Sequence, residues 1–166
     1  MATTKLKGQT VHTSGDLPKV GEPAPEFTAT KGDLSDVRLS DFRGQRVILN
    51  IFPSIDTGVC AQSVRTFNKE AAGLKNTKVL CISKDLPFAQ QRFCGAEGIE
   101  NVLTLSTFRD DTLSKKYGVE LADSGMRGLL ARCVFVIDEE GKIIHAELVP
   151  EITTEPDYQA ALATLK

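Results

Sequence analysis

The chain of 166 residues is 41% hydrophobic and 25% charged, a size and balance that predict a single compact domain spanning residues 1–166. Its formal net charge is −2, with acidic and basic residues interspersed, so no surface for nucleic acid or an anionic membrane is indicated. The N-terminus lacks the apolar run of a signal peptide, and no apolar run approaches the ~20 residues that span a bilayer. We therefore expect a cytoplasmic protein that binds neither nucleic acid nor membrane.

The cysteine pattern limits the chemistry further. The chain has four cysteines, which are too few and too dispersed for a disulfide framework: Cys60, Cys81, Cys94 and Cys133. No pair follows C-x-x-C spacing, and His12 and His145 lie far apart in the sequence, so neither a zinc nor an iron–sulfur site is indicated. We expect reduced thiols at rest, no metal and no cofactor.

Turn signals separate a succession of apolar segments whose order indicates the fold class. In chain order we expect a small hairpin in 1–18, extended chain in 20–29, a strand or turn leading to a loop in 35–45, strands in 46–52, 77–83 and 101–106, helices in 60–74, 85–98 and 110–119, two strands around the turn 138–141, and a final helix in 155–166. The helix in 60–74 is the clearest, because Val64, Phe67 and Ala71 recur at helical spacing.

Strands that alternate with helices pair in parallel, whereas the hairpin near the end of the chain pairs its strands antiparallel. The order therefore predicts an α/β protein with a mixed central sheet flanked by helices. It is typical of a thioredoxin-like fold, here with an N-terminal β-hairpin extension in 1–18.

Cys60 stands apart from the other cysteines. Cys81 and Cys133 lie within apolar strand patterns, where a free cysteine is usually a small buried hydrophobe. Cys60 instead lies at a strand-to-helix junction, where unsatisfied N–H groups and the helix dipole favour a thiolate. The hydroxyl of Thr57 can reach the same turn and hydrogen-bond to sulfur or substrate, although an N-cap or turn role is an equal alternative.

These residues match a known signature. Pro53, Thr57 and Cys60 form P-x-x-x-T-x-x-C, the pattern of peroxiredoxin active sites, and "FPSIDTGVCAQSVRTFN" resembles the bacterial thiol peroxidase family. The resemblance covers nearly the whole chain, since it includes "VGEPAPEF" upstream, "SKDLPFAQQRFCGAEGIENV" in the middle and "RGLLARCVFVID" downstream.

The resemblance implies a role for each matched residue. Cys60 would be the peroxidatic cysteine, whose thiolate attacks a hydroperoxide and becomes a sulfenic acid. Thr57 would orient sulfur and peroxide, Pro53 would shield the pocket from water, and Arg132 would hold its guanidinium near both. Without the resemblance, Arg132 and its nearest competitor, Arg127, are both best explained as surface residues.

A second thiol protects the sulfenic acid from further oxidation. By resemblance, Cys94 would be this resolving cysteine and would form an intrasubunit disulfide with Cys60, which thioredoxin then reduces. The protein would be an atypical two-cysteine peroxiredoxin and a homodimer. The polar flanks of Cys94 favour exposure, although a structural, half-buried cysteine is the alternative. Because a disulfide joins Cα atoms about 5.5 Å apart, we expect local unwinding around one of the two cysteines.

Three alternatives to the peroxidase remain at this point. A peroxide sensor would use the same oxidation of Cys60 but pass the disulfide to a partner protein. A thioredoxin-fold disulfide reductase would show C-x-x-C, and a cysteine hydrolase would need a histidine base, which neither His12 nor His145 suggests. Cys133 departs from the family pattern, which calls for a small or apolar residue. We expect it to point away from Arg132 and to be inert.

Overall fold

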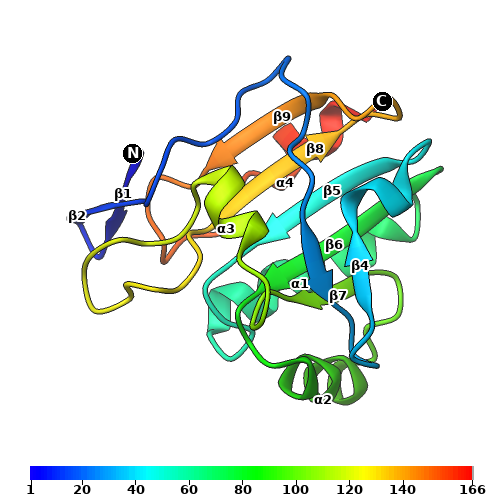
Figure 1. The fold of residues 1–166 in the computed structure, drawn as a ribbon. Helices are drawn as coiled ribbons and strands as arrows, with labels where there is room; N and C mark the ends of the chain where they lie inside the picture. Colours follow the sequence, from blue (N-terminus) through cyan, green and yellow to red (C-terminus); the bar gives the residue numbers. More distant parts are fainter. Residues whose placement is uncertain (166) are drawn as a thin grey trace.

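The computed structural model describes residues 1–165, in which a seven-stranded mixed sheet lies between two apolar layers (Figure 1). In spatial order the sheet contains β4 (Asp36–Arg38), β3 (Thr28–Thr30), β7 (Leu103–Ser106), β6 (Thr77–Ser83), β5 (Arg46–Ile51), β8 (Cys133–Ile137) and β9 (Ile143–Leu148). The helices are α1 (Gly58–Ala71), α2 (Pro87–Glu97), α3 (Thr112–Tyr117) and α4 (Tyr158–Ala163), with a 3-10 turn η1 (Leu39–Phe42). None of these helices is long and apolar enough to cross a membrane.

The strand β5 lies in the interior of the sheet, where five of its six residues are buried and four of those five are apolar. It pairs in parallel with β6, to which it is connected through α1, and antiparallel with β8. The strands β8 and β9 form the expected hairpin, with an irregularity between Val136 and Ile137. The α/β, thioredoxin-like architecture and its mixed sheet are thus confirmed.

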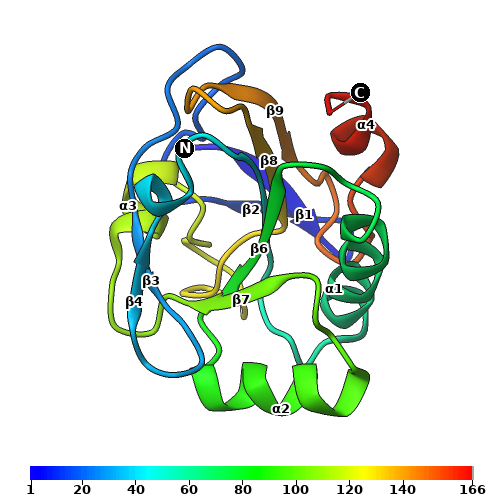
Figure 2. The same cartoon turned by 90° about the vertical axis from the view of Figure 1, so that its right-hand side faces the viewer.

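Alternating side chains of the central strands separate the core into two layers. Figure 2 shows α1 and α4 on one side of the sheet and α3 on the other. Ile48 and Val134 face the layer formed with α1 and α4, which contains Cys60. Their neighbours Leu49 and Phe135 face the layer formed with α3 and the N-terminal region. The helix α2 lies against β7 (Figure 2) and has two buried residues, Pro87 and Gln90, whereas α1 has five.

The N-terminal hairpin is also confirmed, and it consists of β1 (Thr3–Leu6) and β2 (Gln9–His12). Its turn places Lys7 and Gly8 at φ of +50° and +83°, the left-handed conformations that a two-residue hairpin turn requires. Two details differ from expectation. A 3-10 turn replaces part of the loop expected in 35–45. The helix α4 begins later than expected, at Tyr158, because Asp157 caps it by accepting a hydrogen bond from the Ala160 N–H (3.0 Å), and it ends at Ala163. Residue 166, part of the expected helix, lies outside the described residues.

Candidate active site

Cys60 lies in the first turn of α1, directly after the turn that leaves β5. Its side chain is 0% exposed and packs in the layer under α1 and α4. Thr57 occupies the N-cap position but contributes no side-chain hydrogen bond to the helix. Thr57 therefore does not cap the first-turn N–H groups near the sulfur. These N–H groups and the positive end of the helix dipole lie in the same turn as Cys60.

Arg132 provides the main polar contact of this sulfur. It immediately precedes β8, is only 2% exposed, and donates from Nη2 to Cys60 Sγ at 3.3 Å. Its Nε donates to the Ile152 carbonyl at 2.8 Å, which fixes the plane of the guanidinium. Nη1 is buried and has no hydrogen-bond partner among the described residues. A fixed cation with an unpaired donor nitrogen, Nη1, therefore lies beside the Cys60 thiol.

Pro53 and Thr57 meet Arg132 at a cavity of about 260 Å³. Pro53 is buried, whereas Thr57 is exposed. The Thr57 hydroxyl donates to the Ser54 carbonyl at 3.1 Å, so in this conformation it is a turn residue whose oxygen is still able to accept. The structure thus gathers Pro53, Thr57 and Arg132 around the turn that precedes Cys60.

The walls of this cavity come partly from segments that sequence reasoning did not connect with the site. Leu6, from the N-terminal hairpin, and Ile152 both line it, as does Met126. The hairpin is held there by backbone bonds, including one from the Ile152 N–H to the Lys5 carbonyl at 2.8 Å. These contacts join residues more than a hundred positions apart, so no local pattern signals them.

The carboxylate of Glu151 also fastens the hairpin to the site. It accepts hydrogen bonds from the N–H groups of Lys7 (3.1 Å) and Gly8 (2.8 Å), and from the N–H of Thr153 (3.0 Å). The bonds from the Thr153 and Gly8 N–H groups lower the pKa of Glu151 to about 2. The tip of the hairpin is thus tied to the segment whose Ile152 carbonyl holds Arg132.

Cys94 lies in a different environment. It is half-buried on α2, and its Sγ lies 3.7 Å from the Thr104 hydroxyl on β7. Burial raises the pKa of the Cys94 thiol, and the contact with Thr104 lowers it by less. All four cysteines, which lie within the described residues, are free thiols. The polar contacts of the two thiols thus involve different partners, Thr104 for Cys94 and Arg132 for Cys60.

The two remaining cysteines lie deep in the sheet. Burial raises the pKa of Cys81 to about 12 and also raises the pKa of Cys133. Cys133 belongs to the layer opposite the one that contains Cys60, so the expectation that it points away from the Arg132 side is confirmed. Arg127, the competing arginine, is exposed, and its guanidinium donates to the Ser124 carbonyl at 3.2 Å.

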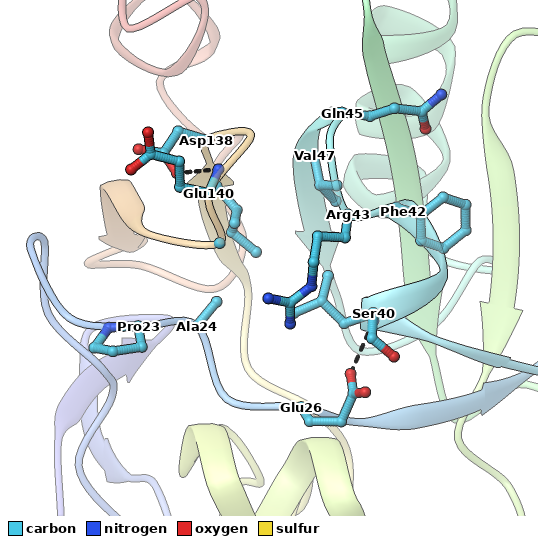
Figure 3. Close-up of a pocket in the computed structure, with 13 residues that line it drawn as sticks. Pro23, Ala24, Glu26, Ser40, Phe42, Arg43, Gln45, Val47, Asp138 and Glu140 are labelled. Atoms are coloured by element: carbon cyan, nitrogen blue, oxygen red, sulfur yellow. Dashed lines mark hydrogen bonds between the residues drawn. The ribbon is translucent and has the colours of Figure 1, made fainter.

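A second hollow, of about 160 Å³, lies elsewhere on the molecule (Figure 3). Val47 and Ile137, which pair across β5 and β8, line it, so it lies at the opposite end of these strands from the turn before Cys60. Arg43 and Glu26 also line it, but Glu26 already accepts a hydrogen bond from the Ser40 N–H at 3.0 Å (Figure 3). Its described lining contains no cysteine, so we assign the chemistry to the cavity beside Arg132.

A buried cysteine at a helix start, beside a buried guanidinium, defines a thiol-based redox protein on a thioredoxin-like fold. The family model described as Redoxin matches residues 19–162. Thiol peroxidases from Mycobacterium tuberculosis and Corynebacterium glutamicum are 58% and 56% identical to this chain, with 99% of both chains covered in each case.

Solved structures agree with this similarity. A peroxiredoxin-like protein from Aquifex aeolicus superposes with a TM-score of 0.94 at 39% identity, covering 99% of this chain and 96% of that one. A thiol peroxidase from Chromobacterium violaceum, at 20% identity, shares the fold with a TM-score of 0.90 over 99% of this chain and 96% of its own. The chain belongs to the redoxin family and, within it, to the thiol peroxidases.

Proposed function

We propose that this thiol peroxidase reduces hydroperoxides at Cys60. The observation that carries the proposal is the Arg132 guanidinium, which donates to Cys60 Sγ at 3.3 Å and keeps Nη1 unpaired among the described residues. When the thiolate attacks one peroxide oxygen, the O–O bond breaks and negative charge develops on the leaving oxygen. Donors fixed in advance around that charge lower the barrier, because they need no reorganisation during the reaction.

The first step oxidises sulfur and reduces the peroxide. The Cys60 thiolate takes one oxygen to become a sulfenic acid, and the other oxygen leaves with a proton as alcohol or water. The Thr57 hydroxyl donates to Ser54, so its oxygen is free to accept the peroxide O–H and orient it. Pro53, which is buried beside this cavity, shields the reacting atoms from water.

We assign the resolving role to Cys94. Its thiolate attacks the Cys60 sulfenic sulfur, the S–S bond forms, and the hydroxyl leaves as water. Because Cys60 contacts Arg132 whereas Cys94 contacts Thr104, the first turn of α1 or part of α2 must rearrange before the two sulfurs meet. Thioredoxin, which supplies two electrons as its own dithiol becomes a disulfide, then reduces the Cys60–Cys94 disulfide.

The cavity also supports a preference among peroxides. Its walls include Leu6, Val59, Met126 and Ile152, so an organic hydroperoxide with an apolar group buries that group there, which hydrogen peroxide cannot do. We place the cycle in the cytoplasm because it requires a compartment that maintains thiol reductants. We further propose that the working enzyme is a homodimer, as the resemblance to thiol peroxidases implies.

A coupled assay tests the proposal. Peroxide reduction is followed as NADPH oxidation in the presence of thioredoxin and thioredoxin reductase, with cumene hydroperoxide and hydrogen peroxide compared. We expect many turnovers, with a higher kcat/KM for cumene hydroperoxide. C94S should consume one equivalent of peroxide and then stall. If the wild type also stops after one equivalent with thioredoxin present, a peroxide sensor that passes its disulfide to another partner becomes the better account.

A further inference from the structure

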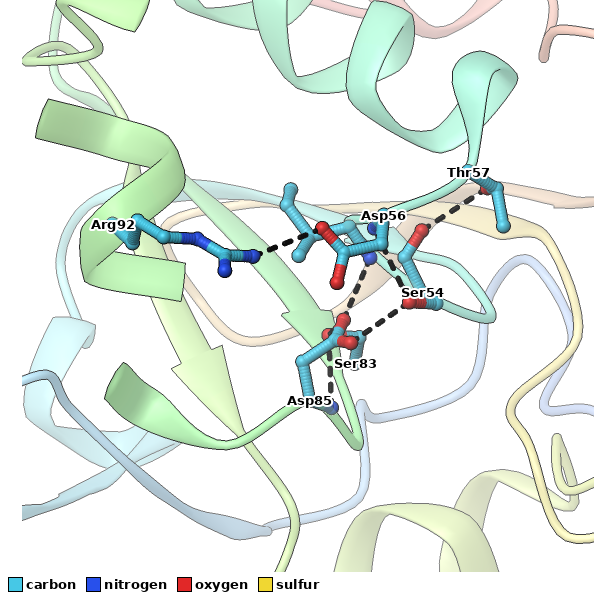
Figure 4. Close-up of polar contacts among 7 residues, drawn as sticks. Ser54, Asp56, Thr57, Ser83, Asp85 and Arg92 are labelled. Atoms are coloured by element: carbon cyan, nitrogen blue, oxygen red, sulfur yellow. Dashed lines mark hydrogen bonds and ion pairs between the residues drawn. The ribbon is translucent and has the colours of Figure 1, made fainter. Parts of the chain in front are cut away.

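A polar cluster lies beneath the turn that leads to Cys60 (Figure 4). At its centre is Asp85, two residues after the end of β6. Its Oδ1 accepts a hydrogen bond from the Ser54 hydroxyl (2.8 Å), and its Oδ2 accepts one from the Ile55 N–H (2.7 Å). The Ser83 hydroxyl donates to the same Oδ2 at 2.6 Å. One carboxylate therefore joins the end of β6 to the turn that follows β5.

Ser54 passes this restraint on to the active site. Its carbonyl accepts from both the N–H (3.2 Å) and the hydroxyl (3.1 Å) of Thr57, as Figure 4 shows for the hydroxyl. Its own hydroxyl, while donating to Asp85, accepts from the Asp56 N–H at 3.2 Å. Ser54 is thus held from below by Asp85 and holds Thr57 from the other side. The position of Thr57, and of the helix start that carries Cys60, depends on this chain of bonds.

Asp85 is itself anchored to the scaffold near α2. Its carbonyl accepts from the Ser106 hydroxyl at 2.5 Å. Gln90, which is 1% exposed on α2, donates to the Ser83 hydroxyl (3.2 Å) and to the Leu105 carbonyl (2.8 Å). The same helix carries Cys94. Asp85 therefore stands between the two elements whose cysteines must approach each other.

A second link between these elements has a different character. Arg92 on α2 pairs with Asp56 at 3.2 Å (Figure 4), but the two side chains are 70% and 64% exposed. Ion pairs in water contribute little, because solvent screens them and long side chains lose entropy in forming them. Hydrogen bonds to a partly buried carboxylate are stronger. The Arg92–Asp56 pair therefore serves as a natural control for the bonds of Asp85.

We propose that Asp85 is a positioning residue that holds the turn before Cys60 in the conformation that reacts with peroxide, and that its bonds to Ser54 and Ile55 open before Cys60 pairs with Cys94. The inference rests on the proposed function. It assigns the movement toward Cys94 to the first turn of α1, which follows closely after Ser54 and Ile55, the residues fastened to the Asp85 carboxylate. Asp85 therefore favours oxidation of Cys60 and opposes formation of the disulfide.

The two steps are separated by rapid mixing of reduced protein with one equivalent of cumene hydroperoxide, followed by acid quenching and mass spectrometry of the reduced, sulfenic and disulfide forms. In D85A we expect Cys60 oxidation to slow about tenfold or more, as expected for a displaced reacting group. We expect conversion of sulfenic acid to disulfide to quicken severalfold. D85N should recover part of the oxidation rate, since its amide oxygen still accepts, and R92A should leave both steps unchanged.

If Asp85 had only a structural role, its substitution would not change the rates of Cys60 oxidation and disulfide formation in opposite directions. Unchanged oxidation in D85A, or both steps slowed together in proportion to lost circular dichroism, would overturn the proposal. If D85A fails to fold, S54A tests the proposal through the same opposed shifts on a smaller scale, because it removes the bond to Asp85 at 2.8 Å together with the longer one from the Asp56 N–H at 3.2 Å. Failure of the wild type to form a Cys60–Cys94 disulfide would refute the proposed function instead. In that case the rate of Cys60 oxidation in D85A, compared with the wild type, would still test whether Asp85 positions the turn.

Discussion

The two cysteines proposed to react in sequence lie in regions of opposite character. Cys60 is fully buried at the junction of the central strand β5 with α1, and Arg132 contacts its sulfur. Cys94 is half-buried on α2, which lies against β7 (Figure 2). Its sulfur contacts only the Thr104 hydroxyl among the described polar groups. Attack on peroxide needs fixed donors, whereas resolution needs movement. The fold provides rigidity at one cysteine and a less enclosed setting at the other.

Substitution of Cys60 should have the largest effect on peroxide reduction. C60S should abolish peroxide reduction in the coupled assay, because a serine hydroxyl is neither ionised at neutral pH nor readily oxidised. C133A removes an equally buried sulfur from the opposite layer, so it should retain turnover for each folded molecule. Substantial turnover by C60S would remove Cys60 from the mechanism.

Replacement of Arg132 should give the next largest effect. R132K keeps the positive charge, but one ammonium cannot donate both to the Ile152 carbonyl and to Sγ in the geometry that the guanidinium has. We expect the second-order rate constant of Cys60 oxidation to fall about a hundredfold, the size of effect of losing a fixed transition-state donor. R127K, at the exposed arginine, is the control. Equal rates in R132K and wild type would contradict the role of Arg132.

The pH dependence of disulfide formation tests the role of the Cys94 thiolate. The pKa of Cys94 is raised, so below that pKa its reactive thiolate is the minor form. The rate of disulfide formation after a single oxidation should therefore rise about tenfold per pH unit between about pH 6 and pH 8. Rapid quenching at several pH values measures this rate. A flat profile would show that Cys94 thiolate formation does not limit the step.

The smallest effect concerns the hairpin that walls the Cys60 cavity. The pKa of Glu151 falls from an ordinary value of 4.5 to about 2, because the Thr153 and Gly8 N–H groups bond to the carboxylate. Its contribution to stability is complete above about pH 4.5 and is lost as the pH falls toward 2. As the pH falls through this window, the unfolding temperature of the wild type should fall further than that of E151Q. Parallel curves for the two proteins would contradict the assignment.

The sequence predicted the parts of this molecule that local patterns encode. Apolar runs indicated β5 and β6, helical spacing indicated α1, and the P-x-x-x-T-x-x-C signature brought Pro53, Thr57 and Cys60 into one turn. The resemblance singled out Arg132, and the structure brings this side chain to Cys60 from 72 positions away. The roles of these residues and of Cys94 stay predictions, as does the assignment of residues 1–166 to a single domain.

Contacts between distant segments could not be read in this way. Leu6 and Ile152 reach the cavity because the hairpin tip is tied to a carboxylate more than a hundred positions away. The sequence placed Asp85 only as the first residue of the helix expected in 85–98, and the fold shows that it holds Ser54 and Ile55. An acidic residue just after a buried parallel strand was the available signal, since the ends of parallel strands share one edge of a sheet.

The central claim, that Cys60 is oxidised and Cys94 resolves it, is tested most directly by mapping the first oxidation product. Fully reduced protein is mixed with one equivalent of cumene hydroperoxide, quenched within seconds by alkylation, and analysed by mass spectrometry for its disulfides. We expect a dominant Cys60–Cys94 disulfide within one chain. Recovery of alkylated Cys60 together with unconsumed peroxide would contradict it.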